Sequence, residues 1–328
     1  MKGRFAPSPS GRMHLGNIFC ALISWLSVRK QGGSWILRIE DLDPARSRRE
    51  YAEMIEEDLR WLGLEPDEGG LSDIGPSGPY SQSRRTKLYE DAFEKLRSGG
   101  LIYPCYCTRA DLNAASAPHG SDNSKIYPGT CRPKNIETQP GKGCKTNIES
   151  TDTVLKEDKS SVSRPLRAYR LMVADKDIVF EDRIYGPQKV NLAREWGDFV
   201  IKRADATWAY QLAVTVDDYA MGVTEVVRGN DLLKSSAPQI YLYSLLGYEP
   251  PQFFHLPLLC NSNGQRLSKR DKSLDMEQLR KDFNPLQLVG WLGYFAGILP
   301  QPFPISPDGL LQLFTPSLIK PVDKIEIN

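Results

Sequence analysis

The sequence lacks the features that mark several large classes of protein. Its 42 basic and 41 acidic side chains nearly cancel, giving a formal net charge of +1, so no bulk electrostatic attraction to nucleic acid is expected. No apolar run reaches about 18 residues, so no membrane span is expected. Six cysteines among 328 residues do not indicate a disulfide scaffold. A motif already begins at Arg4, and we therefore expect no signal or transit peptide.

One loop near the start has the composition of a phosphate-binding site. Residues 4–14 are rich in Pro, Ser and Gly, and from Leu15 to about Arg29 apolar residues recur at helical spacing. The loop therefore opens onto a helix N-terminus, whose unpaired N–H groups and positive dipole end favour an anion. His14 and Asn17 fall in the first turn and can donate to phosphate oxygens. A loop of this kind is more often a plain turn, so its composition alone does not establish a phosphate-binding site.

A second loop, far along the chain, favours the interpretation as a phosphate-binding site. Residues 261–270 form a polar, glycine-bearing segment that carries Arg266 and Lys269 on either side of Ser268. A lone basic loop is more often a solvated surface. The two loops together, in this order, resemble the paired signatures of the class I aminoacyl-tRNA synthetases. His14-Leu15-Gly16-Asn17 corresponds to the HIGH signature and Arg266-Leu267-Ser268-Lys269-Arg270 to the KMSKS signature.

Further segments resemble the glutamyl-tRNA synthetase branch of that class. They are Arg4–Gly11, Arg38–Asp43, Tyr210–Asp218 and Gly222–Gly229. Within the branch, the short chain and a cysteine cluster are most similar to the glutamyl-Q tRNA(Asp) synthetases, which lack an anticodon-binding domain. The resemblance covers most of residues 3–272. It implies activation of L-glutamate with ATP and Mg²⁺, and transfer of the glutamyl group to queuosine at the wobble position of tRNA(Asp).

The resemblance also implies the residues of the site. Those expected to bind ATP are His14, Gly16, Asn17 and Lys269, and those expected to act in catalysis by clamping the phosphates are His14, Asn17, Arg266 and Lys269. Those expected to bind glutamate are Arg4, Phe5, Ala6, Pro7, Ser8, Glu40, Tyr210 and Arg228. The chemistry agrees, because guanidinium groups bind carboxylates bidentately and Glu40 can pair with the ammonium group. Arg38, Asp41 and Asp43 are expected to form a structural salt-bridge network instead.

Three cysteines are placed for a metal. Cys105 and Cys107 are separated by one residue, and Cys131 follows beyond a loop, so the three can supply three corners of a tetrahedral zinc site. Unrelated thiols are the alternative. The resemblance implies a zinc knuckle in which Tyr127 is the fourth ligand. His119 lies in the same loop and competes for that position.

Alternating strand-like and helix-like segments predict an α/β fold, a Rossmann-type doubly wound parallel sheet. Strands are expected at 34–39, 166–170, 177–182, 199–203 and 223–227, and helices at 15–29, 46–62, about 89–96 and 239–246. The catalytic domain is predicted in two halves, 1–91 and 196–260. A zinc-bearing α+β insertion domain at 92–195, with a mobile loop at 133–164, is predicted to separate them and, by resemblance, to contact tRNA. Its candidate phosphate-binding residues are Arg132, Lys134, Arg164, Arg167 and Arg170.

Residues 261–328 are predicted to hold the KMSKS-like loop and a short helical C-terminal region. One helix is expected from Asn284-Pro285 to about Leu292, followed by a proline-rich tail. We therefore expect no anticodon-reading domain in residues 261–328. Three alternatives stay open: a truncated or divergent glutamyl-tRNA synthetase that charges the 3′ end of tRNA(Glu), a small-molecule adenylyltransferase, and a catalytically inactive tRNA-binding module. We expect a cytoplasmic monomer.

Overall fold

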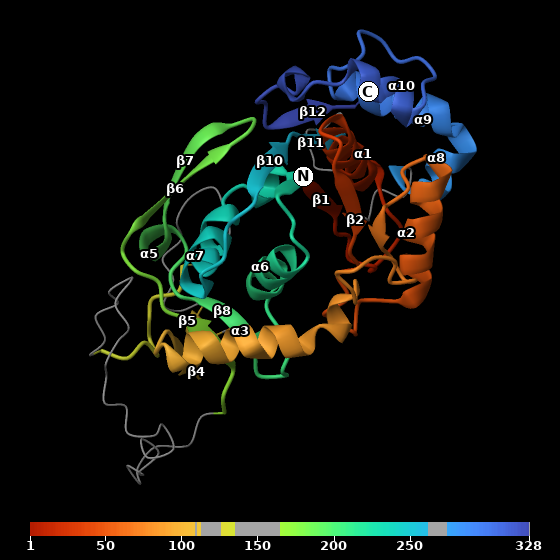
Figure 1. Ribbon diagram of the computed structural model, residues 1–328. Helices are drawn as coiled ribbons and strands as arrows, with labels where there is room; N and C mark the ends of the chain where they lie inside the picture. The colour runs from red at the N-terminus through yellow and green to blue at the C-terminus, as the bar shows by residue number, and fades with distance from the viewer. Residues whose placement is uncertain (109, 113–125, 135–164, 262–273, 328) are drawn as a thin grey trace.

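The computed structural model describes residues 1–108, 110–112, 126–134, 165–261 and 274–327. Its centre is a seven-stranded sheet in the order β3-β2-β1-β9-β10-β6-β7 (Figure 1). These strands are β1 (Lys2–Phe5), β2 (Ser34–Leu37), β3 (Glu68–Gly69), β6 (Asp177–Asp182), β7 (Gly186–Asn191), β9 (Glu225–Gly229) and β10 (Gln252–Leu256). Neighbours from β3 through β6 run parallel, and the edge strand β7 is antiparallel. The α/β fold is confirmed, but the sheet is mixed rather than wholly parallel.

Alternation along β2 shows how the sheet separates two cores. Trp35 and Leu37 are buried on the side of helix α1 (Leu15–Lys30), whereas Ile36 faces the opposite core. On that opposite side lie three helices, which share a further buried cluster (Figure 1). They are α3 (Thr86–Ser98), α6 (Tyr210–Ala220) and α7 (Ser236–Leu246). Helices therefore cover both faces, as the doubly wound pattern predicts. No helix within the described ranges is both long and apolar enough to cross a membrane.

A smaller antiparallel sheet contains β4 (Ile102–Cys105), β5 (Ala168–Leu171) and β8 (Phe199–Arg203). The two sheets exchange strands across the expected domain limits. The β6–β7 hairpin, from within 92–195, extends the large sheet, while β8, from within 196–260, joins the small one. The short helix α5 (Leu192–Glu195) connects them. The four domain limits stay a prediction. The 135–164 part of the expected mobile loop lies outside the described residues.

The C-terminal region is more structured than expected. It contains the helices α8 (Met276–Asp282), α9 (Pro285–Phe295) and α10 (Pro307–Leu313), and the strand β12 (Lys324–Glu326). The helix at Pro285 is confirmed, with Asn284 as its N-cap. The prediction that only a proline-rich tail follows this helix was wrong. Pro307 occupies the first turn of α10, where proline is well tolerated, and Ser306 is the N-cap of that helix. Strand β12 pairs in parallel with β11 (Leu258–Cys260).

Two predicted boundaries move for local reasons. Helix α2 (Arg49–Trp61) begins later than residue 46, because Asp43 closes a turn by accepting a hydrogen bond from the backbone N–H of Ala45 at 3.1 Å. Strand β9 begins later than residue 223. There Val223 still donates its N–H to the carbonyl of Asp218 at 2.8 Å, which closes the end of α6.

Candidate active site

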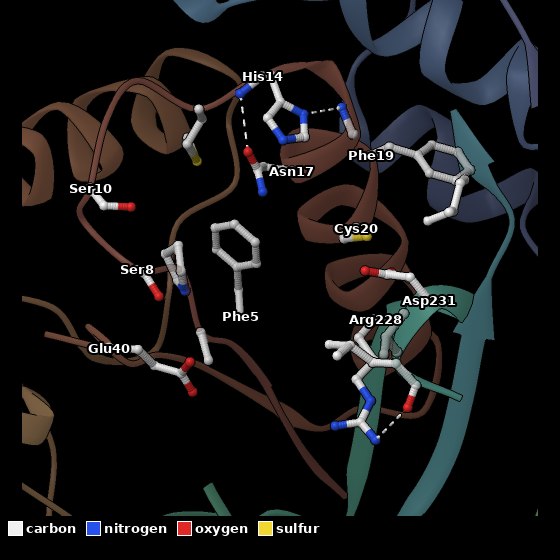
Figure 2. Close-up of a pocket in the computed structure, with 18 of the residues that line it drawn as sticks. Phe5, Ser8, Ser10, His14, Asn17, Phe19, Cys20, Glu40, Arg228 and Asp231 are labelled. Carbon is white, nitrogen blue, oxygen red and sulfur yellow. Dashed lines mark hydrogen bonds between the residues drawn. The ribbon is translucent and has the colours of Figure 1, made fainter. Parts of the chain in front are cut away.

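A cavity of about 510 Å³ opens beyond the carboxyl ends of β1, β2 and β9 (Figure 2). Parallel sheets of this kind bind their ligands at that edge. Every predicted glutamate-binding residue and every described ATP-binding residue lines this one cavity: Arg4, Phe5, Ala6, Pro7, Ser8, His14, Gly16, Asn17, Glu40, Tyr210 and Arg228. Arg12, Arg46 and Asp231 also line the cavity and were not predicted. Arg12 belongs to the same loop as His14, whereas Arg46 and Asp231 approach the cavity only through tertiary folding.

The start of α1 forms one wall of the cavity. His14 is its N-cap, with Nδ1 accepting a hydrogen bond from the N–H of Gly16 at 3.2 Å, while Asn17 Oδ1 accepts from the N–H of His14 at 3.1 Å. A neutral imidazole whose Nδ1 accepts carries its proton on Nε2, which is then a donor. A Cβ on Gly16 would lie 3.1 Å from the His14 ring, so glycine lets the imidazole sit close to the backbone. The helix start thus combines backbone and side-chain donors for an anion.

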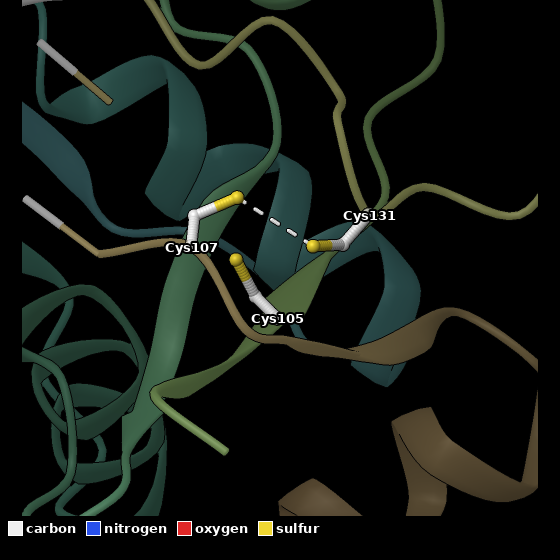
Figure 3. A group of neighbouring side chains, drawn as sticks. All are labelled: Cys105, Cys107 and Cys131. Atoms are coloured by element: carbon white, nitrogen blue, oxygen red, sulfur yellow. Dashed lines mark hydrogen bonds between the residues drawn. The ribbon is translucent and has the colours of Figure 1, made fainter. Parts of the chain in front are cut away.

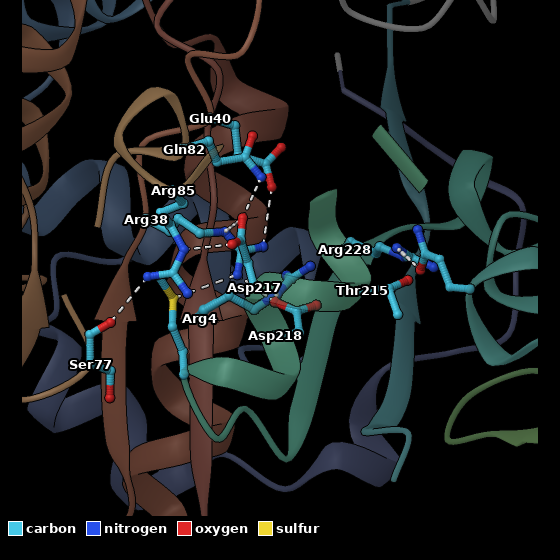
Figure 4. A network of polar contacts seen from close by, with 12 residues as sticks. Arg4, Arg38, Glu40, Ser77, Gln82, Arg85, Thr215, Asp217, Asp218 and Arg228 are labelled. Carbon is cyan, nitrogen blue, oxygen red and sulfur yellow. Dashed lines mark hydrogen bonds and ion pairs between the residues drawn. The ribbon is translucent and has the colours of Figure 1, made fainter. Parts of the chain in front are cut away.

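The floor of the cavity is a buried network of opposite charges (Figure 4). Arg4 Nε donates to Asp218 Oδ1 at 3.2 Å. The guanidinium of Arg38 donates to the same oxygen at 2.6 Å and to Glu40 Oε1 at 3.2 Å. Arg38 is fully buried and pairs with Asp218 and Glu40, which confirms its expected place in a structural salt-bridge network. Asp41 and Asp43 are not part of it, because they accept from Ser83 and from the backbone N–H of Ala45 instead. Although burial opposes it, the cations Arg38 and Arg4 hold the pKa of Asp218 below its usual range.

Glu40 lies in the same network and faces the cavity (Figure 2). Burial raises its pKa, and the nearby charges of Arg38 and Arg4 only partly oppose that shift. A ligand ammonium group beside Glu40 would therefore stabilise the carboxylate. Tyr210, the first residue of α6, places its phenol among the charges of Arg228, Glu40 and Arg4.

Arg228, at the end of β9, forms the opposite wall (Figure 2). Its Nε donates to His255 Nε2 at 2.9 Å, and its other nitrogens donate to Gln239, Ser236 and the Leu232 carbonyl at 2.8 to 3.3 Å. These partners carry no recognisable sequence motif. They could not be found from the sequence, because β9, α7 and β10 bring them together only in the folded chain.

Arg266, Lys269 and His119 lie outside the described residues. The segment that follows the second basic loop is described, and it returns to the helix start. Asp275 forms a β-bridge with His14, and the N–H of Met276 donates to the carbonyl of Met13 at 2.9 Å. The chain after the KMSKS-like segment is therefore anchored beside the HIGH-like segment.

The model of one protein family, "tRNA synthetases class I (E and Q), catalytic domain", matches residues 1–297. The chain belongs to this family. A glutamyl-Q tRNA(Asp) synthetase of Nitratidesulfovibrio vulgaris is 45% identical over 99% of this chain and 97% of its own length. One of Symbiobacterium thermophilum is 46% identical over 95% of this chain and 91% of its own length. A glutamate tRNA ligase from Elizabethkingia meningosepticum, solved in complex with its amino acid, matches all of this chain and 67% of its own, with 28% identity and a TM-score of 0.80.

The three cysteines among the four expected metal ligands of this class I synthetase do meet (Figure 3). The sulfur atoms of Cys105, Cys107 and Cys131 all lie within 4.8 Å of one another. The hydroxyl of Tyr127 lies 3.6 Å from Cys105 Sγ and 3.7 Å from Cys107 Sγ. The donor set is therefore compact enough for a single tetrahedral ion.

Of the expected phosphate-binding residues of the synthetase, Arg170 is wrong because it is occupied inside the protein, and Arg132 is partly buried in an internal ion pair. Arg170 is buried, with its Nε 3.3 Å from Cys105 Sγ and its guanidinium 3.7 Å from the centre of the Tyr127 ring. Arg132 pairs with Asp198 at 2.9 Å. Lys134 and Arg167 are exposed, and Arg164 lies outside the described residues.

The stability of the synthetase is expected to depend on His255 at mildly acidic pH. Its side chain is fully buried, and burial, with Arg228 nearby, lowers its pKa from 6.5 to about 4. The unfolded chain therefore takes up this proton near pH 6.5, whereas the folded chain resists it until about pH 4, so stability is lost as the pH falls between these values. Urea unfolding should show that His255 accounts for roughly 2 kcal/mol of the loss between pH 7 and pH 5. His255→Gln should lose correspondingly less over this interval, and an equal loss in both proteins would contradict the assignment.

Proposed function

We propose that this synthetase activates L-glutamate with ATP and Mg²⁺ and transfers the glutamyl group to queuosine at the wobble position of tRNA(Asp). A carboxylate oxygen of glutamate attacks the α-phosphorus of ATP, and pyrophosphate leaves with the broken phosphoanhydride bond. The protein acts mainly by positioning the reactants and by stabilising charge. Mg²⁺, when bound, offsets charge on the ATP phosphates. We propose that the enzyme works in the cytoplasm as a monomer.

The observation that carries the activation step is the single cavity in which two buried guanidinium groups, one carboxylate and a helix N-terminus converge. Arg4 and Arg228 suit the two carboxylates of glutamate, and Glu40 suits its ammonium group. His14 Nε2 and the amide group of Asn17 lie at the helix start, where they can donate to ATP phosphates. Arg266 and Lys269 are proposed to supply the remaining cations of this clamp.

The lengths over which the relatives match this chain support tRNA(Asp) as the acceptor of the glutamyl group. The chain spans nearly the full length of the two glutamyl-Q tRNA(Asp) synthetases but only 67% of the glutamate tRNA ligase. Residues 274–327 fold onto α1 and β11 rather than forming a separate helical domain. A catalytic core of this size is suited to meeting the anticodon arm with the surface that longer relatives offer to the acceptor stem.

The test is to incubate the enzyme with ATP, labelled glutamate and total tRNA, beside tRNA whose 3′ ends alone are blocked. Label on tRNA(Asp) that survives blocking and requires queuosine is the expected result. Label on tRNA(Glu) that disappears on blocking would mean an ordinary, shortened glutamyl-tRNA synthetase. Pyrophosphate exchange without labelling of either tRNA would leave glutamate activation standing and overturn the acceptor.

We also propose that Cys105, Cys107, Cys131 and Tyr127 hold one Zn²⁺, which would tie β4 to the segment after residue 126. The donor set fits, since three sulfurs and one phenol converge, and Arg170 beside them offsets the negative charge of three thiolates. Emission spectrometry of the purified enzyme should find about one zinc per chain. Cys107→Ser should lose the metal and melt several degrees lower, whereas Cys20→Ser, on α1, should keep it. Full zinc in Cys107→Ser, or none in the wild type, would contradict the site.

A further inference from the structure

Arg228 is a buried cation held entirely by neutral groups. His255 Nε2, Gln239 Oε1, Ser236 Oγ and the Leu232 carbonyl each accept a hydrogen bond from it, and the Tyr210 phenol lies against it as well. Among the described residues, none of the ion pairs includes Arg228. Four fixed bonds define the plane of the guanidinium, while none of these acceptors cancels its charge.

The other arginine of the cavity is arranged differently. Arg4 shares a carboxylate oxygen of Asp218 with Arg38, so part of its charge is already offset within the protein. Burial lowers the pKa of Arg228, which reflects the cost of keeping that cation away from water. A ligand carboxylate that contacts Arg228 would therefore relieve a larger cost than one that contacts Arg4 alone.

The tautomer and orientation of His255 depend on a second residue behind it. His255 lies on β10, directly opposite Arg228 on β9, and its Nδ1 lies 2.6 Å from Asp182 Oδ2 at the end of β6. Asp182 also accepts the backbone N–H groups of Ile184 and Tyr185, at 3.1 and 3.0 Å, so the carboxylate is fixed in place. A neutral imidazole that donates from Nδ1 to Asp182 must offer its Nε2 lone pair to Arg228.

We propose that His255 and Asp182 are positioning residues that hold Arg228 in plane without an ion pair of its own, and that they thereby set the affinity for the substrate carboxylate. This inference rests on the proposed glutamate site. The chain of contacts crosses three adjacent strands, from β6 in the hairpin at the sheet edge through β10 to β9. Any neutral side chain at position 255 that can accept a hydrogen bond from Arg228 should preserve substrate binding. Loss of that hydrogen bond should weaken binding of the substrate carboxylate.

Two substitutions separate the contacts of the imidazole. His255→Gln places an amide near the position of Nε2 and can still accept from Arg228, whereas His255→Asn places it near Nδ1 and keeps only the contact with Asp182. Loss of a hydrogen bond to a charged group predicts a ~10-fold to 100-fold higher glutamate KM for His255→Asn, with ATP KM and kcat within about twofold of wild type. His255→Gln should stay within about threefold in all three constants. Asp182→Asn should fall between them.

A control substitution separates this effect from a general loss of stability. Tyr80→Phe is the matched control. It also removes a buried hydrogen bond, from Tyr80 to Glu68 at 2.8 Å, but it lies outside the cavity and should melt lower without a change in glutamate KM.

Calorimetric titration with glutamate distinguishes the ways in which the idea can fail. A wild-type enzyme that neither binds glutamate nor forms its adenylate overturns both the proposed function and this inference. Wild-type binding, together with equal affinities for His255→Asn and His255→Gln, overturns the positioning role alone. So does a parallel rise in glutamate and ATP KM, since that pattern would follow from a general loosening of the fold.

Discussion

Arg4→Ala should raise the KM for glutamate ~10²-fold to 10³-fold, the equivalent of losing about 3–5 kcal/mol of interaction with a buried charge. The residue is 4% exposed, lies at the end of β1 and lines the cavity, so a substrate carboxylate would meet it in the absence of bulk water. ATP KM should change little, because the donors at the start of α1 remain in place. Pyrophosphate exchange at varied glutamate and ATP concentrations measures both constants.

The fold should tolerate this change. Asp218 keeps its hydrogen bond to Arg38 at 2.6 Å, so no buried carboxylate is abandoned when Arg4 is removed. Arg4→Lys is the paired control. It restores the charge but not the planar fork, and we expect it to recover only part of the affinity. An equal rise in both KM values would contradict the assignment of Arg4 to the glutamate side of the cavity.

Lys269→Ala should slow glutamyl-adenylate formation ~10²-fold to 10³-fold, the usual result of removing one contact of about 2.7–4 kcal/mol made in the transition state. The reason is electrostatic, since charge builds up on the departing pyrophosphate and a cation near it stabilises that charge. Single-turnover formation of the adenylate, at saturating ATP and glutamate, measures the step directly. Glutamate affinity should be unchanged.

Lys272→Ala is the matched control, because it removes the same charge two residues after the KMSKS-like signature ends at Arg270. It should react at a rate close to wild type. If the two variants lose activity equally, the effect belongs to the general charge of the segment, and the specific role of Lys269 is refuted.

The elements that could be predicted from the sequence are those encoded by neighbouring residues. The helix that begins at Leu15 and the cap that precedes Pro285 are encoded within a few neighbouring residues, and both appear where expected. The cavity residues could be named because the resemblance connects distant segments. Their supports could not, since nothing in the residues around Asp182 or His255 indicates that β6 and β10 are adjacent. The addition of β12 to β11 is equally non-local.

The basic residues of the insertion also show a difference between what the sequence indicates and what the fold decides. Counting basic residues in the insertion suggested a surface for phosphates, yet Arg170 and Arg132 are taken up by a sulfur and by a buried carboxylate. Sequence records which side chains carry charge. Only the fold decides whether a charge faces water, a neighbour or a ligand.

The exchange of strands between the two sheets limits how the chain can be cut and recombined. The insertion contributes β6 and β7 to the large sheet and takes β8 in return, so neither piece has a complete set of hydrogen-bonded edges by itself. Removing the insertion as a cassette would expose the edge of β10 and strip away the residue behind His255. Because the two sheets share strands across these limits, the intact chain is expected to melt in one cooperative transition.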